Sequence, residues 1–488
     1  MPAGNISDSK QQLNFEISGM KTAIIFDIFG PYHWSRTSAA ARLLSSVTAI
    51  EVFSRNKEYP WFASERAGQI DYQQVLPGAE RHSYSRKKLI AGIRRALDLA
   101  SPDVVVVPGW SDHWSLAALE WCKNNRVPSV IMSESTAWDE PRKPWKEFIK
   151  RRIVGLGTAA LVGGSPHREY LAQLGMPAER VFLGYDAVDN AYFAAAAAKV
   201  RGQSSVVSPS PSDSDLRPPT SDLCSPVSNL QSQVSGLRSL AREVCSVTSS
   251  GSPPVSQLPA PNFFLASARF IEKKNLRRLI EAYARYRILA QKSETGNPRP
   301  APCSDLPSQV SGLRSQVSAP WSLVLLGDGE LRPAICSQIQ ALGLQSSVLL
   351  AGAKPYAELP AYYANAGAFI HASTTEQWGL VVNEAMASGL PVLVSNRCGC
   401  AQDLVQEGVN GFTFDPYNVE QLAQLMVQVS NFKFQVSEFG AASARLISNW
   451  GPERFAQGLA AAVEKAVACG PVKPTLLQRL ILKALLAR

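Results

Sequence analysis

Short runs of apolar residues alternate with helix-like segments twice along this 488-residue chain, and this alternation constrains the fold more than any other feature. Continuous apolar runs are typical of strands that helices cover on both faces, as in a parallel sheet. In the first half we expect strands at Thr22–Phe26, Ala49–Phe53, Val104–Val107, Ser129–Met132, Ala159–Val162 and Val181–Leu183. In the second half we expect them at Phe263–Ala266, Leu323–Leu326, Val348–Leu350, Ala368–Ile370 and Val392–Ser395. Helices are expected between strands, for example at Thr37–Val47, Lys87–Leu99 and Ser115–Asn124. The pattern predicts an α/β fold of two Rossmann-like, doubly wound domains that face a cleft.

Two segments break this alternation. Residues 201–261 and 292–320 are rich in Ser, Pro, Gln and Val, so they lack the apolar surface that a packed core requires. They share a repeat, which runs from Ser232 to Ser239 and recurs unchanged from Ser308 to Ser315. Two unequal copies are too few to stack as a solenoid. We therefore expect disordered insertions in exposed loops, with a partner-docking tag as the alternative.

The chain is basic, with a net charge of +9 and a pI near 9.1, which favours acidic partners such as nucleotides, anionic lipids or nucleic acid. The positive residues gather in two helical stretches: Arg81, Arg86, Lys87, Lys88, Arg94 and Arg95, and Arg142, Lys143, Lys146, Lys150, Arg151 and Arg152. Neither stretch has the interleaved aromatics of a nucleic-acid reader. We expect no nucleic acid, and either an anionic membrane surface or a merely solvated face. Residues 475–488 form a basic amphipathic helix that either lies on a bilayer or packs its leucines on the first domain.

Metal ligation and membrane spanning find no support in the sequence. The eight cysteines and five histidines fit no zinc or other ligand spacing, so no metal site is expected. Scattered cysteines in a large chain indicate a reducing compartment. Residues 1–19 lack the apolar core of a signal peptide, and no run of eighteen apolar residues occurs. We expect a cytoplasmic protein, soluble or peripheral on the inner face of the plasma membrane.

The segment from Glu376 to Val392 is the most specific indicator of function, because it carries two carboxylates eight positions apart. Glu376 follows an apolar strand, and Glu384 lies inside a helix that begins near Gly379 and ends at Gly389. A helix N-terminus that begins with glycine leaves backbone amides for a phosphate. Such a pair of carboxylates can hold the hydroxyls of a sugar and of a ribose on either side of a diphosphate. The motif predicts a nucleotide-sugar site.

Together with the Glu-Ala-Met-Ala-Ser-Gly-Leu-Pro-Val run and the Gly408–Phe412 turn, this motif resembles the Glu-x7-Glu signature of retaining glycosyltransferases of family 4 (glycosyl transferases group 1), which have the GT-B fold. The resemblance covers roughly residues 20–190 and 262–470 and is strong only in the second stretch. It implies that Glu384 holds the ribose and that Glu376 holds the donor sugar, while the amides of Gly379 and Leu380 bind the diphosphate. The alternative is that the two carboxylates are a solvated loop residue and a helix-surface residue.

The resemblance also implies roles for residues in other loops. Arg269 and Lys274 match an arginine and a lysine that face the donor diphosphate in the family, although Lys273 could stand in for Lys274. A guanidinium and an ammonium can stabilise the charge on a departing diphosphate without a metal ion, so we expect no metal and no other cofactor. Gly327 lies in a turn that could approach the base or ribose. Gly30 follows the first strand and could approach the donor phosphate.

The chain departs from the family pattern in two places. Many members have a histidine after a central strand of the first domain, and here Glu134 or Ser135 takes that position, with His113 as another candidate. Gly399, Cys400 and Asp403 lie where many members have paired glycines. Because of these departures, the resemblance does not assign what either loop contacts.

By the resemblance, the chain divides into five parts: a flexible leader (1–19), an acceptor-side domain (20–190), a linker with the first insertion (191–261), a nucleotide-sugar-binding domain (262–448) and C-terminal helices that cross back to the first domain (449–488). The implied reaction moves a sugar from a nucleotide-diphosphate donor to a hydroxyl of a glycolipid or oligosaccharide acceptor, in cell-envelope polysaccharide biosynthesis. A related GT-B epimerase or phosphorylase is one alternative. A catalytically inactive GT-B module that binds glycans or protein partners is another. A dinucleotide oxidoreductase is disfavoured, because no Gly-x-Gly-x-x-Gly follows the first strand of either half.

Overall fold

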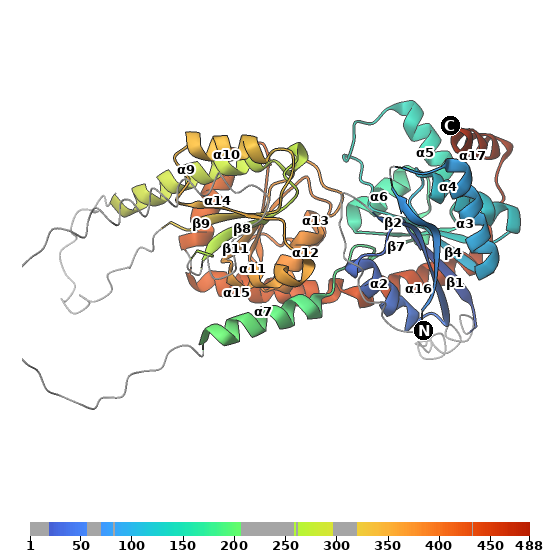
Figure 1. Cartoon of the computed structure of the whole chain (residues 1–488), viewed down its shortest axis with the longest axis horizontal. Coiled ribbons are helices and arrows are strands. Elements are labelled where there is room, and N and C mark those ends of the chain that lie inside the picture. Colours follow the sequence, from blue (N-terminus) through green and yellow to red (C-terminus); the bar gives the residue numbers. More distant parts are fainter. Residues whose placement is uncertain are drawn as a thin grey trace, which may run out of the picture.

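The computed structural model describes residues 19–55, 70–81, 83–205, 258–259, 262–295, 320–431 and 433–488. The predicted leader and most of the two predicted insertions, including both copies of the repeat, lie outside the described residues. The described part forms two α/β domains that lie side by side in Figure 1. Each is built on a parallel sheet, which confirms the predicted fold class.

The first domain has a seven-stranded sheet in the order β3-β2-β1-β4-β5-β6-β7. Its strands are β1 (Lys21–Phe26), β2 (Ser46–Arg55), β3 (Asp71–Glu80), β4 (Val104–Pro108), β5 (Ser129–Ser133), β6 (Ala159–Val162) and β7 (Val181–Leu183). Its helices are α2 (Pro31–Ala41), α3 (Arg86–Ala100), α4 (His113–Asn125), α5 (Pro144–Val154) and α6 (Ser165–Gln173), with the 3-10 helix η1 (Ala178–Arg180). Strand β3 was not predicted, because two glutamines and a Pro-Gly pair interrupt its apolar pattern.

The helix expected at Thr37–Val47 is displaced in the structure. It begins earlier, at Pro31, whose fixed φ suits the first helical turn, and it ends at Ala41. Residues from Ser46 onward form β2, which is rich in β-branched side chains and pairs with β1. The sequence prediction was wrong for residues 42–47.

The second domain has a six-stranded sheet in the order β10-β9-β8-β11-β12-β13. Its strands are β8 (Phe263–Ser267), β9 (Ser322–Leu326), β10 (Val348–Gly352), β11 (Ala368–His371), β12 (Val392–Ser395) and β13 (Gly411–Phe414). Its helices are α9 (Leu276–Thr295), α10 (Arg332–Ala341), α11 (Leu359–Asn365), α12 (Leu380–Ala387), α13 (Ala401–Leu404), α14 (Val419–Asn431) and α15 (Lys433–Ile447), with the 3-10 helices η3 (Glu272–Lys274), η4 (Tyr356–Glu358) and η5 (Ser448–Trp450). Strand β13 was expected to be a turn. Glycine at position 411 permits the pairing with β12, because a Cβ there would lie 1.8 Å from the Val392 carbonyl oxygen.

Two helices leave the domain that comes before them in the chain and pack on the other domain. Helix α7 (Asn190–Ser205) fills the start of the segment assigned to the linker and packs on α11 and α12 of the second domain. Helix α16 (Pro452–Cys469) crosses back to pack on α2 and on β5, β6 and β7 of the first domain (Figure 1). Helix α17 (Leu476–Ala487) then packs on α4 and α5, with Leu482 and Leu486 in the first core and Leu480 exposed.

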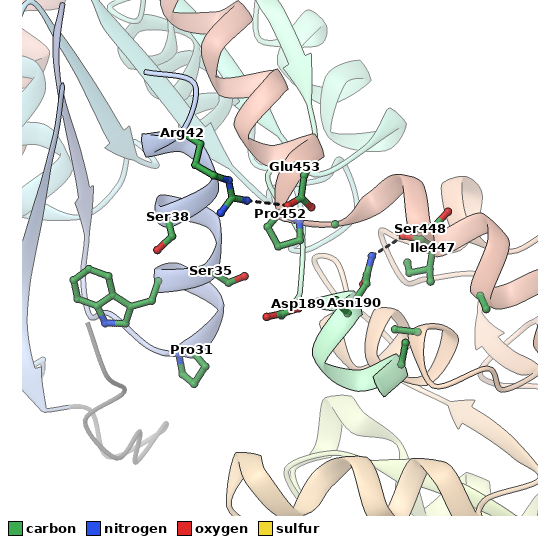
Figure 2. A pocket seen from close by; sticks show the side chains of 16 residues that line it. Pro31, Ser35, Ser38, Arg42, Asp189, Asn190, Ile447, Ser448, Pro452 and Glu453 are labelled. Atoms are coloured by element: carbon green, nitrogen blue, oxygen red, sulfur yellow. Dashed lines mark hydrogen bonds and ion pairs between the residues drawn. The ribbon is translucent and has the colours of Figure 1, made fainter. Parts of the chain in front are cut away.

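The segments that lead into α7 and α16 meet beside a cavity of about 780 Å³ between the domains. Figure 2 shows α2 on one side of this cavity and the starts of α7 and α16 on the other. The Asn190 side-chain amide donates to the Ile447 carbonyl oxygen at 2.6 Å, and Arg42 pairs with Glu453 at 2.9 Å. The hydrogen bond thus joins the two segments that connect the domains.

Candidate active site

The carboxylate of Glu376 lies where the adjacent strands β8 and β11 end, because parallel neighbours point their carboxyl ends to the same sheet edge. Its nearest partner is the ammonium of Lys274, with which it forms an ion pair, and the ammonium of Lys273 lies 3.7 Å away. The Ser373 hydroxyl donates to it at 3.2 Å, and Nε2 of His371 lies at 3.4 Å. The structure thus joins Glu376 and Lys274, the two predicted site residues, directly.

Two opposing effects set the ionisation of Glu376. Burial alone would raise its pKa, but the hydrogen bond with His371 and the charges of Lys274 and Lys273 outweigh burial and hold the pKa well below its usual range. Burial also lowers the pKa of His371, against the opposing pull of Glu376. The site therefore presents a carboxylate that stays ionised at neutral pH beside a neutral imidazole.

Helix α12 begins next to His371 and Glu376, since a Cβ at Gly379 would lie 3.4 Å from Nε2 of His371. Gly379 precedes it with φ of 103°, in the left-handed region that glycine adopts without strain. The first N–H groups of a helix have no acceptor within it, so the amides at Gly379 and Leu380 can serve an anion. This arrangement matches the predicted turn and helix, while anion binding there stays a prediction.

Glu384 is buried inside α12, only 2% exposed, which rules out the alternative of a helix-surface residue. The Tyr32 hydroxyl, from the first domain, donates to Oε1 at 2.6 Å, and the Tyr363 hydroxyl donates to Oε2 at 2.7 Å. Burial raises the pKa of Glu384 to about 7, although both hydrogen bonds oppose the rise. A ribose that reaches Glu384 must therefore share or displace the Tyr32 hydroxyl.

Arg269 and Gly327 lie in the loops after β8 and β9. Arg269 is half-buried. A Cβ at Gly327 would lie 1.9 Å from the Ala268 carbonyl oxygen, and one at Gly329 would lie 2.7 Å from that of Phe270. The glycines thus let the β9 turn press against the backbone of the loop that carries Arg269. Contact of Gly327 with a base or ribose, as the sequence predicts, is a separate matter and stays a prediction.

Gly30 is the N-cap residue of α2 and is buried. Its amide donates to Nδ1 of His33 at 3.2 Å, and burial, helped by Arg36, lowers the pKa of His33 to about 3. Arg36 itself is 2% exposed and donates to the Ala187 carbonyl oxygen at 2.8 Å. Because Tyr32 reaches Glu384, the α2 N-terminus with Gly30 faces α12 across the interface.

A cavity of about 310 Å³ lies between the domains next to Glu376. Its lining comes from both domains: Trp110, Ser111, Ser135, Asp139, Glu140, Lys150, Lys273, Thr375, Glu376 and Gln377. Of the three first-domain candidates, Ser135 lines this cavity. His113 instead has the Tyr84 hydroxyl at 3.4 Å from its Nδ1. Glu134 has a raised pKa, first because of burial.

Sequence reasoning missed several residues of the site. His371 ends strand β11, and a polar residue at the carboxyl end of a parallel strand is a usable signal for a site residue. Tyr32 and Tyr363 gave no such signal, because each is an aromatic in a helix. Among the described residues no group of three or more His, Cys, Asp or Glu could hold a metal ion. In the same part of the chain, no helix combines the length and apolarity needed to cross a membrane.

Residues 306–438 match the family model described as glycosyl transferases group 1. Sucrose synthase 2 of Pisum sativum is 42% identical over 71 residues, which cover 14% of this chain and 9% of that protein. The poly(glycerol-phosphate) alpha-glucosyltransferase of Bacillus subtilis is 26% identical over 146 residues, 30% of this chain and 21% of that protein. The sulfoquinovosyl transferase of Arabidopsis thaliana is 37% identical over 101 residues, 20% of this chain and 19% of that protein. The chain thus spans about a fifth or less of the length of these three relatives.

The fold of both domains is similar to solved structures. That of Anabaena HepE in complex with UDP matches with a TM-score of 0.56 at 16% identity, over 90% of this chain and 98% of that one. Sucrose-phosphate synthase of Thermosynechococcus elongatus matches with a TM-score of 0.56 at 15% identity, over 90% of this chain and 97% of that one. Likeness at such identities shows the fold, here GT-B. The second domain is thus similar in sequence to glycosyl transferases group 1 over residues 306–438, and both domains together have the GT-B fold.

Proposed function

We propose that this protein is a retaining glycosyltransferase that moves a sugar from a nucleoside diphosphate to an acceptor hydroxyl. The observation that carries the proposal is the Glu376–Lys274 ion pair below the N-terminus of α12, at the edge of a cavity shared by both domains. It combines an ionised carboxylate for sugar hydroxyls with a cation and backbone amides for phosphate.

The donor is held entirely by the second domain in this proposal. Glu376 accepts hydrogen bonds from the donor sugar, and Glu384 accepts them from the ribose. The diphosphate lies against Arg269, Lys274 and the amides of Gly379 and Leu380. These groups stabilise the negative charge that grows on the diphosphate as the glycosidic bond breaks, without need of a metal ion.

The acceptor enters from the first-domain side of the cavity. Its hydroxyl oxygen forms the new bond to the sugar on the face that the diphosphate leaves, so the configuration at the anomeric carbon is retained. The bond from that carbon to the diphosphate breaks, and the departing phosphate oxygen takes the hydroxyl proton. Closure of the domains excludes water from this step and limits hydrolysis.

The donor base that we propose is uracil, and the acceptor is a glycolipid or a surface-polysaccharide precursor. The structure of Anabaena HepE, similar in fold, was solved with UDP and with UDP-glucose. The Bacillus subtilis relative is named for glucosyl transfer to poly(glycerol-phosphate). Both names support the proposal by analogy.

An amphiphilic acceptor would bring the protein to an anionic membrane surface at the cytoplasmic face. Exposed apolar side chains of α5 and α17 accompany the basic residues of these helices: Trp145, Phe148, Leu476, Leu477 and Leu480. The charge of α5 is partly neutralised, because Lys146 and Lys150 both pair with Glu140. Sedimentation with phosphatidylglycerol vesicles, set against phosphatidylcholine vesicles, tests this part. Equal recovery in both supernatants would remove the membrane from the proposal.

Nucleotide binding gives the first test of the function. Unfolding temperatures are measured with UDP, GDP, ADP and CMP for the wild type, Arg269→Ala and Lys274→Ala, with Arg277→Ala as a control. Arg277 is an exposed residue of α9 beyond the predicted phosphate site. We expect stabilisation by UDP that both site variants lose and the control keeps. If the protein binds UDP but neither transfers nor hydrolyses the sugar of any UDP-sugar, an inactive module is favoured. If it binds none of the four nucleotides, the proposal is refuted.

A further inference from the structure

The donor loop Glu376–Gly379 is held from both sides, and one side belongs to the first domain. Within the second domain, the Gly399 amide donates to the Glu376 carbonyl oxygen at 3.1 Å and the Cys400 amide donates to that of Trp378 at 3.2 Å. The Gln377 carbonyl oxygen, between these two, points to His167 of the first domain, which lies 2.9 Å away through Nε2. Every residue from 376 to 378 thus has its carbonyl fixed.

The protonation of His167 follows from its second partner. The Gly164 amide donates to Nδ1 at 3.1 Å, so Nδ1 carries no proton and Nε2 donates to the Gln377 carbonyl oxygen. His167 is fully buried, and burial lowers its pKa, which favours this neutral form. The imidazole thus bridges α6 and the donor loop: it accepts from the Gly164 amide and donates to the Gln377 carbonyl oxygen.

A second bridge from α6 reaches the turn behind the loop. The backbone amide of Ser165 donates to Oδ2 of Asp403 at 2.8 Å, and its hydroxyl donates to Oδ1 at 2.6 Å. The carboxylate thereby caps a helix of the other domain, where its charge is favourable. Asp403 follows the Gly399–Cys400 turn, so this bridge and that of His167 act on the same segment.

The interface is closely packed at two glycines, where any larger residue would clash. A Cβ at Gly164 would lie 2.1 Å from Oδ2 of Asp403, and one at Gly399 would lie 1.7 Å from the Gln377 carbonyl oxygen. The Trp378 ring lies between His167 and Trp450, with ring centres 5.8 Å and 5.3 Å apart. Trp450 lies in η5, at the crossing between the domains.

We propose that Ser165 and His167 are positioning residues for the donor site: through Asp403 and the Gln377 carbonyl, the first domain sets the place of the Glu376 carboxylate. This inference rests on the proposed function. Neither residue lines the cavity beside Glu376. In the proposed function the nucleotide is held mainly by Arg269, Lys274, Glu384 and the Leu380 amide, which lie outside the bridged residues 376–378. Loss of the bridges therefore displaces the sugar-binding carboxylate and leaves nucleotide binding nearly intact. The transfer step is therefore the one that suffers.

The experiment compares His167→Phe, His167→Gln and Asp403→Ala with the wild type, and uses Asp415→Ala as a control. Asp415 accepts a hydrogen bond from the Tyr417 amide at 3.0 Å, within the second domain. We expect His167→Phe and Asp403→Ala to lower kcat by at least about tenfold, since a small displacement of a reacting group is costly. The Kd of UDP should change by less than about threefold in both variants. Glutamine can still donate to the Gln377 carbonyl, so His167→Gln should recover most of the kcat.

The outcomes separate this inference from the proposed function. Hydrogen exchange of the 376–400 segment is measured alongside activity, and we expect faster exchange of the Gly399 and Cys400 amides in Asp403→Ala and His167→Phe. Four results would each overturn the positioning role. The first two are unchanged hydrogen exchange and an unchanged kcat in the folded variants. The other two are a parallel loss of UDP affinity and a His167→Gln variant as poor in kcat as His167→Phe. If the wild type transfers no sugar, the proposed function fails, and the exchange data still decide whether the first domain holds the loop.

Discussion

Replacing Glu384 by glutamine should stabilise the protein, and increasingly so as the pH rises. The folded protein buries this carboxyl and raises its pKa from the ordinary 4.5 to about 7. Between these two values the folded state keeps a proton that the unfolded state releases, so wild-type stability falls as the pH rises through this window. Glutamine imitates the protonated carboxyl and does not titrate. Its oxygen can accept from one tyrosine, and its NH2 group can donate to the hydroxyl of the other.

The size of the effect follows from the pKa. A rise from 4.5 to about 7 corresponds to roughly 3 kcal/mol at about 1.4 kcal/mol for each pKa unit. The Glu384→Gln variant should match the wild type near the lower pKa and exceed its stability by about this amount near pH 8. For a domain of this size, Tm should then rise by about 6–12 °C.

The assay is thermal and urea unfolding followed by circular dichroism at steps from about pH 5 to about pH 8. Glu376→Gln is the matched control, because hydrogen bonding with His371 and the nearby lysines hold the pKa of Glu376 below its usual range despite burial. Its stabilising contribution is present above the unfolded pKa and is lost as the pH falls through the folded pKa. Glutamine at position 376 should therefore destabilise by an amount that stays constant across this pH range, because Glu376 gains its proton only below it. A Glu384→Gln difference that does not grow with pH would refute the reasoning about burial.

Three further substitutions test other parts of the site. Lys274→Met removes the nearest cation of Glu376, and we expect UDP affinity to fall at least about tenfold in titration calorimetry; undiminished affinity would contradict the phosphate role. Tyr32→Phe removes one of the two hydrogen bonds that lower the pKa of Glu384, so unfolding should cost about 1–3 kcal/mol less and the carboxyl should titrate at higher pH. An unchanged titration in carboxyl-labelled NMR spectra would count against that bond. Gly399→Ala forces a Cβ onto the Gln377 carbonyl and should lower kcat by at least about tenfold, whereas Gly202→Ala, with open space around its Cβ, should keep the wild-type kcat.

Local sequence patterns were sufficient for most of the architecture and for part of the site. The apolar runs of β1, β4, β8 and β12 identify strands because burial on both faces demands unbroken apolar sequence. The helix that follows Gly379 could be predicted from its boundaries, since a helix commonly ends at a left-handed glycine such as Gly389. That Glu376 and Lys274 belong to one site could be predicted from a motif and from the rule that ligands bind where strands end, whereas their ion pair is a finding of the structure.

What only the tertiary structure decided are contacts between residues far apart in the chain. The bond from Tyr32 to Glu384 joins positions 352 residues apart, and that from Ser165 to Asp403 joins positions 238 apart. No local periodicity encodes such pairs, because each partner is an ordinary residue of its own helix or turn. Burial is equally a property of the assembled domains: it raises the pKa of Glu384, while the partners around Glu376 overcome it. The sequence alone thus determined most strands of the two sheets, and it brought Glu376 and Lys274 into one predicted site. The folded chain decided which side chains hold that loop in place, because those contacts exist only where two separately patterned domains meet.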